Sequence, residues 1–253
     1  MIKDRAAVQS LLERAMGAGC TTLVLTVDLP MPGIRHRDHR NGMFEKTLFG
    51  ALARTWQVLS RPRWLFDVGL RGKPHTFGNF ADLVPAGASL DTYKVWIDDN
   101  YDRSVTWDDI AWVRQLWQGK LLLKGILEVD DALRAVDAGA DGISVSNHGG
   151  RQLDSVASTI SKLPPIVDAV GGAIEVLMDG GVRSGLDVFK ALALGAKGVM
   201  IGRPWVWALS GAGERGLDQL LDTMQAELEV AMALSGVNHI AEIGPHLLDY
   251  YGV

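Results

Sequence analysis

A histidine, two glycines and an arginine stand together at positions 148–151, directly after an apolar run at 142–145. The apolar run is typical of a buried strand, so these side chains should lie where that strand ends. Histidine exchanges a proton near neutral pH, and glycines let the backbone come close to a ligand. The planar fork of arginine suits a carboxylate. His148 beside Arg151 therefore predicts proton abstraction from a small organic acid.

A second constellation, Asp179-Gly180-Gly181-Val182-Arg183-Ser184-Gly185, leads from an apolar run toward a predicted helix. Glycines free backbone N–H groups to approach an anion, and the N-terminus of a helix adds its dipole. Arg183, together with Gly202-Arg203 further along the chain, could supply charge-assisted hydrogen bonds. We therefore expect a phosphate site, and a turn that merely caps a helix is the alternative.

Other polar residues also follow apolar runs. Asp28 needs a partner at a strand end, which could be a histidine or the backbone. Lys124 ends a Leu-Leu-Leu run, so its ammonium either reaches solvent or faces a negatively charged ligand. Arg35, in a glycine-proline loop, is either a second anion contact or an ordinary surface charge.

The elements that must position these residues show in a repeated pattern. A small residue and a glycine precede a short apolar run at 18–25, at 138–145 and at 194–201. In each case a helix would end on the glycine, and the apolar run would form a buried parallel strand. Further strands are predicted at 121–123 and 174–178, and helices at Arg5–Gly17, Trp107–Gln118 (with Thr106 as N-cap and Asp109 as its partner), Val129–Ala138 and Gly185–Leu194 behind Ser184.

Alternating strands and helices predict an α/β fold with a parallel sheet, either open and doubly wound or closed as a TIM (β/α)8 barrel. The barrel is favoured because the chemically suggestive residues follow strands, and barrel active sites form at the carboxyl ends of strands. A closed barrel needs eight strands, and the sequence shows five. We expect a partial barrel without about its first three βα units, as a single domain over 1–253 with a basic, aromatic loop inserted at about 36–105.

Composition narrows the function classes. Of the 253 residues, 47% are hydrophobic and 22% are charged, which suits a folded domain. A net charge of −5 argues against general nucleic-acid binding. The single cysteine, Cys20, excludes a disulfide framework and a CxxC metal site, and no metal is expected. No apolar run approaches the length of about 18 residues that spans a bilayer, and no signal peptide is seen, so we expect a cytoplasmic protein, soluble or peripheral.

Positive charge concentrates in the segment 35–75, which carries nine Lys/Arg against three Asp/Glu. Phe44, Leu48, Leu52 and Trp56 follow one another there at a spacing of four residues, which would form one apolar stripe on a helix. The stripe could pack on the protein's own barrel. It could also belong to a basic amphipathic surface that meets anionic lipid, and the sequence leaves both interpretations open.

The stretch 146–154 also carries a resemblance. It reads Ser-Asn-His-Gly-Gly-Arg-Gln-Leu-Asp, which matches the signature of the FMN-dependent 2-hydroxy acid oxidases and dehydrogenases. Companion motifs in matching order are Leu-Thr-Val-Asp-Leu-Pro at 25–30, Pro-Gly-Ile-Arg at 32–35, Lys-Gly-Ile-Leu at 124–127 and Asp-Gly-Gly-Val-Arg from 179. The resemblance runs from Met1 to about Ile243 and looks closest to the bacterial L-lactate dehydrogenases that feed the respiratory chain.

The resemblance implies a role for each of these residues. His148 would be the general base that takes a proton from the substrate's hydroxyl or from its α-carbon, and Asp28 would stabilise the imidazolium that results. Arg151 would clamp the substrate carboxylate, with Arg35 contributing from its loop. Lys124 would lie near N1 and O2 of the flavin and stabilise its reduced form. The flavin ring would bond Thr26, and the ribityl and phosphate end would be held by Asp179, Gly180, Gly181, Arg183, Gly202 and Arg203.

The implied reaction is the oxidation of an L-2-hydroxy acid, foremost L-lactate to pyruvate, which leaves two electrons on FMN. A dehydrogenase would pass these electrons to a quinone or a cytochrome, as a peripheral protein on the cytoplasmic face of the inner membrane. An oxidase of the glycolate or mandelate type would pass them to oxygen. The resemblance further suggests a homotetramer.

The resemblance is incomplete at the front. Members of the family carry two active-site tyrosines, and a serine and a glutamine that contact FMN, before the position that corresponds to Met1. We therefore expect the chain as written to bind FMN weakly and to turn over slowly or not at all. A non-catalytic remnant that binds flavin or phosphate is the second function class.

Overall fold

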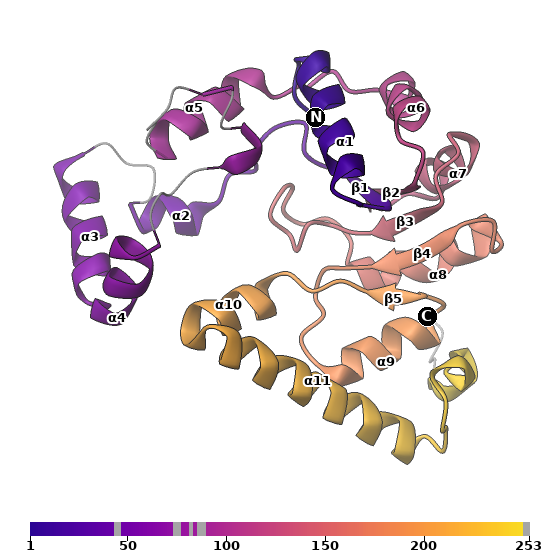
Figure 1. The fold of residues 1–253 in the computed structure, drawn as a ribbon. Helices are drawn as coiled ribbons and strands as arrows, with labels where there is room; N and C mark the ends of the chain where they lie inside the picture. Colours follow the sequence, from indigo (N-terminus) through magenta and orange to yellow (C-terminus); the bar gives the residue numbers. More distant parts are fainter. Residues whose placement is uncertain (43–46, 73–76, 81–82, 85–89, 250–253) are drawn as a thin grey trace. The chain divides into compact units, whose positions relative to one another are not determined.

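The computed structural model describes residues 1–42, 47–72, 77–80, 83–84 and 90–249. The chain forms two compact units (Figure 1). The barrel unit consists of Met1, Leu12–Pro30 and Ser104–Val253. The insert unit consists of Ile2–Leu11 and Met31–Arg103.

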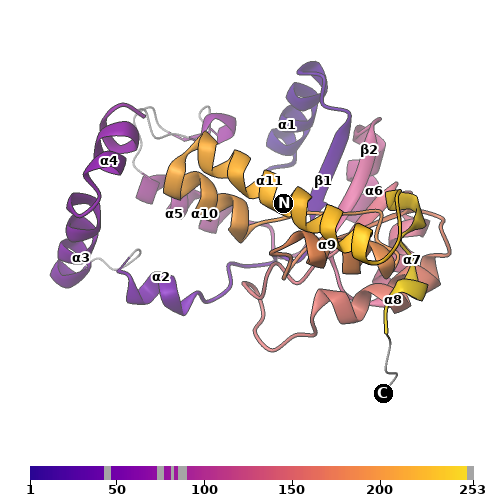
Figure 2. The ribbon, with the colours of Figure 1, turned by 90° about the horizontal axis from the view of Figure 1, so that it is seen from below.

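The barrel unit is built on a five-stranded parallel sheet whose order, β1-β2-β3-β4-β5, follows the sequence. Strands β1 and β2 lie side by side in Figure 2. Sequential parallel strands with helices between them form the wall of a TIM barrel, as the sequence predicted. Within the described residues the sheet is not closed, because β1 and β5 each pair with one neighbour. The strands are Thr22–Thr26 (β1), Lys120–Ile126 (β2), Gly142–Val145 (β3), Glu175–Met178 (β4) and Gly198–Val199 (β5).

Helices follow the strands and pack on them. Helix α7 contacts β2 and β3, α8 contacts β3 and β4, and α9 contacts β5 and the long α11. The predicted helices are confirmed, and Asp109 accepts a hydrogen bond from the backbone N–H of Thr106 at 2.8 Å, as expected for that N-cap. The helices are α1 (Arg5–Gly17), α6 (Trp107–Leu116), α7 (Val129–Asp137), α8 (Thr159–Val170), α9 (Gly185–Ala193), α10 (Arg203–Ala212) and α11 (Glu214–Leu234), with 3-10 turns at Ile240–Glu242 (η3) and Pro245–Leu247 (η4).

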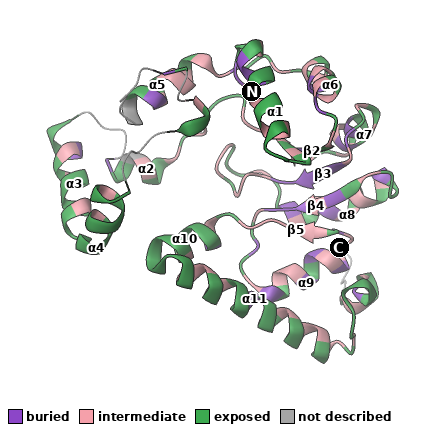
Figure 3. Cartoon of the chain, viewed as in Figure 1, coloured by how far each residue is buried: buried purple, intermediate pink, exposed green. Residues whose placement is uncertain are grey.

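The core lies at the centre of the sheet (Figure 3). Every residue of β3 is buried, and Leu121 and Leu123 of β2 are inaccessible to solvent. Each such side chain contributes about 2 kcal/mol by leaving water. Strand β1, at the edge, alternates between half-buried and exposed residues, and Val24 is 43% exposed. His148 and Lys124 of the site described below are therefore anchored on the best-buried strands.

The insert unit carries the basic segment. Ile2 pairs with Tyr101 in an isolated antiparallel bridge, and Arg5 forms an ion pair with Asp102 at 2.8 Å. No helix in the described ranges is long and apolar enough to cross a membrane. The helices here are α2 (His36–Arg40), α3 (Leu48–Leu59), α4 (Pro62–Trp64), η1 (a π-helix, Leu65–Leu70), η2 (a 3-10 helix, Gly78–Phe80) and α5 (Leu90–Asn100).

The predicted apolar stripe falls mainly on α3. Its members Leu48, Leu52 and Trp56 are 79%, 60% and 71% exposed, so the stripe is a surface feature rather than part of a core. Phe44, which the stripe also included, lies outside the described residues, as do Lys46, Lys73 and His75.

Candidate active site

The predicted site residues of the barrel unit lie where its strands end. Thr26 is the last residue of β1 and is in register with Lys124 on β2. His148 follows β3, and Asp179 directly follows β4. Arg203 follows β5 as the first residue of α10. Because the strands are parallel, these positions share one end of the sheet, as the barrel interpretation required.

His148 and Asp28 form the pair that the sequence suggested. The Nδ1 atom of His148 lies 3.2 and 3.3 Å from the two carboxylate oxygens of Asp28. The side chains are 24% and 14% exposed, so water screens their interaction only partly. An Nδ1–H that donates to Asp28 leaves Nε2 with a lone pair, and this nitrogen can then act as a base.

The loop after β3 turns sharply to present this histidine. His148 has a φ of +54°, a left-handed conformation that costs a non-glycine residue about 1 kcal/mol or more. Gly149 and Gly150 continue the turn with φ values of +66° and +69°. Two side chains hold the turn, because Ser146 accepts from the backbone N–H of His148 and Asn147 accepts from that of Gly149, at 3.1 and 3.0 Å. The side chains of Ser146 and Asn147 thus hold the strained backbone of the two residues that follow them.

Lys124 enters a buried polar cluster at the same end of the sheet. Its Nζ atom lies 3.0 Å from Asp179 and 2.9 Å from the hydroxyl oxygen of Ser146. Asp179 also accepts hydrogen bonds from Ser144 at 3.1 Å and from Ser146 at 2.7 Å. Both serines are inaccessible to solvent. A fixed ammonium is therefore held at the strand ends, and the predicted contact of Asp179 with the ribityl end stays a prediction.

Gly125 makes room for the histidine's partner. It has a φ of +106°, and a Cβ atom added there would lie 2.6 Å from the Cβ of Asp28. The pairing of β2 with β3 also shifts register between Lys124 and Ile126, as a β-bulge does. The bulge places Gly125 against Asp28, and only glycine fits there.

Three arginines surround the predicted phosphate end. Burial lowers the pKa of Arg203 first, and the positive charges of Arg183 and Arg151 lower it further. Arg203 donates to the carbonyl oxygen of Gly149 at 2.7 Å, and Arg183 lies over the ring of Trp207. Among the described residues none of the three guanidiniums forms an ion pair with a carboxylate. Converging cations without a counter-charge fit a phosphate group, which carries up to two negative charges.

The backbone amides at the N-terminus of α9 have partners within the chain. The backbone N–H groups of Arg183 and Ser184 donate to Asp187, at 2.9 and 3.1 Å, and that of Gly185 donates to Glu227 at 2.7 Å. The chain's own carboxylates therefore satisfy these three amides, and the predicted phosphate contacts of Gly181 and Arg183 stay predictions. The N-cap of α10 is Gly202, which has no side chain that could cap this helix.

Several residues around the site were not singled out from the sequence. Ser144 and Ser146 are polar residues at buried positions of an apolar run, a signal that could have identified them. Thr159 donates to the carbonyl oxygen of Gly180 at 2.9 Å and fixes the glycine turn. Arg35 belongs to the insert unit, so its proposed substrate contact stays a prediction. The described residues contain no group of three or more His, Cys, Asp or Glu side chains that could hold a metal.

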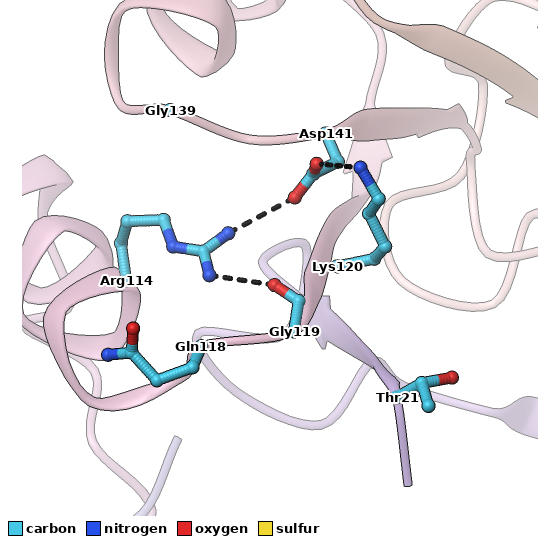
Figure 4. A pocket seen from close by; sticks show the side chains of 7 residues that line it. All are labelled: Thr21, Arg114, Gln118, Gly119, Lys120, Gly139 and Asp141. Carbon is cyan, nitrogen blue, oxygen red and sulfur yellow. Dashed lines mark hydrogen bonds and ion pairs between the residues drawn. The ribbon is translucent and has the colours of Figure 1, made fainter.

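A hollow of about 440 Å³ opens at the other end of the sheet (Figure 4). The Asp141 carboxylate in this hollow forms ion pairs with Lys120 at 2.7 Å and with Arg114 at 3.1 Å. The hydrogen bond from Lys120 and the backbone N–H of Leu121 hold the pKa of Asp141 below its usual range. The charged side chains that line the hollow are therefore paired with one another at the start of the strands. Its lining residues are Thr21, Arg114, Gln118, Gly119, Lys120, Gly139 and Asp141.

Comparisons with known proteins agree with this geometry. The L-lactate dehydrogenase of Caulobacter sp. (strain K31) is 50% identical over 98% of this chain, and that of Pseudomonas syringae pv. syringae (strain B728a) is 48% identical over the same share. The chain spans 65% of the length of both relatives. A crystal structure of the monotopic membrane protein (S)-mandelate dehydrogenase superposes with a TM-score of 0.87 at 36% identity, covering 98% of this chain and 65% of that one.

A mandelate oxidase structure is similar at 39% identity, with a TM-score of 0.72 over 95% of this chain and 59% of the oxidase. Residues 1–250 match the family of FMN-dependent dehydrogenases, whose cofactor is FMN. The surplus of cations at the arginine cluster, beside the fixed ammonium of Lys124, fits that cofactor. The chain therefore belongs to the FMN-dependent dehydrogenase family.

Proposed function

We propose that this chain carries the active site of an FMN-dependent enzyme that oxidises an L-2-hydroxy acid, with L-lactate as the favoured substrate. The observation that carries the proposal is the His148–Asp28 pair at 3.2 Å, held at the strand ends beside the Lys124 cluster. The names of relatives that are about half identical over nearly the whole chain support lactate as the acid.

The cationic side chains at the carboxyl ends of the strands would bind FMN. Arg183 and Arg203 would bind its phosphate, with Gly202 leaving the backbone open to it, and Lys124 would face the flavin ring. A fixed ammonium near the ring favours the negative charge that reduction brings. When bound, FMN supplies the acceptor for the two electrons that the substrate gives up.

The chain's own residues would accept one proton from the substrate and bind its carboxylate. Nε2 of His148 would take the hydroxyl proton of the substrate, while the two electrons of the Cα–H bond leave with that hydrogen and a 2-oxo acid forms. Asp28 would stabilise the imidazolium, because it already contacts Nδ1 at 3.2 Å. Arg151, three residues after the histidine, would hold the substrate carboxylate, and Arg35 would add a second contact.

The test is a comparison of acids on the FMN-saturated chain. Anaerobic reduction of the bound flavin should be fastest with L-lactate, slower with glycolate and L-mandelate, and absent with D-lactate. Saturating FMN compensates for weak binding, and a single turnover detects even a slow reaction. A chain that binds FMN but is reduced by none of these acids would contradict the proposal and favour a non-catalytic flavin-binding role.

We also propose that the surface of α3, α4 and η1 rests on an anionic membrane, where electrons pass to a quinone or a cytochrome. Apolar side chains are exposed along α3, with Arg54, Arg61 and Arg63 nearby. Such a basic amphipathic face gains from both lipid contact and anionic headgroups. The likeness to a protein described as monotopic supports membrane contact. The cytoplasmic side and a homotetramer remain parts of this proposal.

Liposome sedimentation tests the membrane surface. The chain should bind vesicles that contain anionic lipid at low salt, and a variant with Leu48, Leu52 and Trp56 changed to serine should not. A matched control changes three exposed apolar residues of α11 (Leu221, Val230 and Leu234) to serine and should keep binding. Equal binding by both variants would contradict the membrane proposal. Rapid reduction of oxygen by the FMN-loaded chain would instead favour an oxidase, the function of the similar mandelate oxidase.

A further inference from the structure

The hydroxyl of Ser146 links the Lys124–Asp179 ion pair to the turn that carries His148. It donates to Asp179 at 2.7 Å and accepts from the Nζ atom of Lys124 at 2.9 Å and from the backbone N–H of His148 at 3.1 Å. A serine hydroxyl has one donor and two acceptor sites, so all three are used. Ser146 itself is inaccessible to solvent, and water cannot replace these bonds.

We propose that Ser146 is a positioning residue that holds the Lys124 ammonium and the His148 turn in one fixed arrangement. The proposal rests on the proposed function, because its consequence is a fixed relation between the flavin-facing cation and the base. Lysine is a point charge on a flexible stem, so a single ion pair to Asp179 leaves its position loosely defined. The second contact, to Ser146, fixes it. The same oxygen holds the N–H of a residue whose left-handed φ is intrinsically unfavourable.

Ser144 provides the matched control. It lies two residues earlier, is equally inaccessible to solvent, and donates to the same carboxylate at 3.1 Å. No hydrogen bond links it to Lys124 or to the His148 turn in the described residues. A role that is only structural would therefore be shared by both serines, whereas positioning belongs to Ser146 alone.

The experiment compares Ser146→Ala, Ser146→Cys and Ser144→Ala in the full chain. Three properties are measured: the free energy of unfolding in urea, the ring C–H resonances of His148 without FMN, and the midpoint potential of bound FMN. In Ser146→Ala we expect the histidine resonances to shift and broaden. The FMN potential should fall by about 30 mV, which is a tenfold change for a two-electron couple. Cysteine keeps a weak donor and acceptor at similar volume, so Ser146→Cys should lie between wild type and Ser146→Ala.

Ser144→Ala should lose stability without moving the histidine resonances; because Ser144 donates to the Asp179 oxygen that pairs with Lys124, the resonances are the readout that separates the two serines. The inference is overturned if the two alanine variants lose similar stability and leave both spectroscopic readouts at wild-type values. The histidine resonances need no cofactor and no substrate. If the wild-type chain binds no FMN or oxidises no acid, the proposed function fails, while the resonances still decide whether Ser146 positions the turn.

Discussion

The two ends of the barrel sheet both collect charged residues, yet only one end is arranged for chemistry. At the start of the strands, Asp141 is paired with Lys120 and Arg114, and it also accepts a hydrogen bond from the backbone N–H of Leu121. At the far end, three arginines converge with no carboxylate partner among the described residues, and His148 sits in a left-handed conformation. At the first end the charged side chains pair with one another, whereas at the second end a negatively charged ligand would supply the partner that the arginines lack.

This difference shows that a cluster of charged residues is informative when its cations have no carboxylate partner within the chain. The paired end lines the hollow in Figure 4, so concavity alone would have selected the wrong end of the sheet. Cation surplus and backbone strain at the other end are costs that folding alone does not explain. In barrels the carboxyl ends of strands carry catalysis, and the opposite face contributes stability. Substitutions at the two ends should therefore have opposite kinds of effect.

The largest effect is expected from His148→Ala at the ligand-requiring end. Loss of the base should slow flavin reduction by L-lactate about a thousandfold, within the usual range for general base catalysis. The free energy of unfolding should fall by only about 1 kcal/mol, because Asp28 loses one partner while alanine keeps the same left-handed backbone strain. Stopped-flow absorbance and urea unfolding measure the two quantities. A variant that stays within tenfold of wild type would remove His148 from the role of base.

Gly125→Ala should be the next largest. The added Cβ would lie 2.6 Å from the Cβ of Asp28, and the φ of +106° is unfavourable for alanine. We expect a loss of about 3 kcal/mol in unfolding free energy, in the range for steric and backbone strain. Gly150→Ala is the control, because it shares a positive φ but its Cβ would meet no described atom within 4 Å. Equal losses in the two variants would show that strain alone, and not contact with Asp28, decides the result.

Arg203→Met should affect cofactor binding more than folding. Removing one of three converging cations should weaken FMN binding about thirtyfold and leave the binding of riboflavin, which lacks the phosphate, unchanged. The ligand-free chain should lose little stability, since relief of repulsion from Arg183 and Arg151 offsets the lost bond to Gly149. Titration by flavin fluorescence measures both ligands. Equal weakening for the two flavins would place Arg203 away from the phosphate.

The smallest effect is expected at the paired end, from Asp141→Asn. At neutral pH we expect a loss of about 2 kcal/mol in unfolding free energy, because charge-assisted bonds become neutral ones. The pKa of Asp141 is lowered in the folded chain, so its contribution is complete above the unfolded value of about 4. It is lost as pH falls through the lower folded pKa. The two unfolding curves should therefore converge in acid, and flavin reduction should keep its wild-type rate.

Much of this arrangement could be predicted from the sequence. The glycine and apolar runs identified the five strands that the described residues form, and the family resemblance paired His148 with Asp28. Local signals failed where distant residues decide the outcome. Helix α8 runs through Pro164 and Pro165 because its buried face, including Leu163 and Ile166, outweighs their local preference. The hydrogen bond from the Gly185 amide to Glu227 could not be foreseen either, because Glu227 lies 42 residues further along the chain.

The measurement closest to the central claim is a single anaerobic turnover of the FMN-saturated chain with L-lactate. The visible absorbance of the bound flavin should bleach, and one pyruvate should form for each flavin reduced. D-lactate should cause no bleaching, and His148→Ala should bleach about a thousandfold more slowly. Bleaching at the same rate in wild type and His148→Ala, or no bleaching in a wild-type chain that holds FMN, would contradict the account.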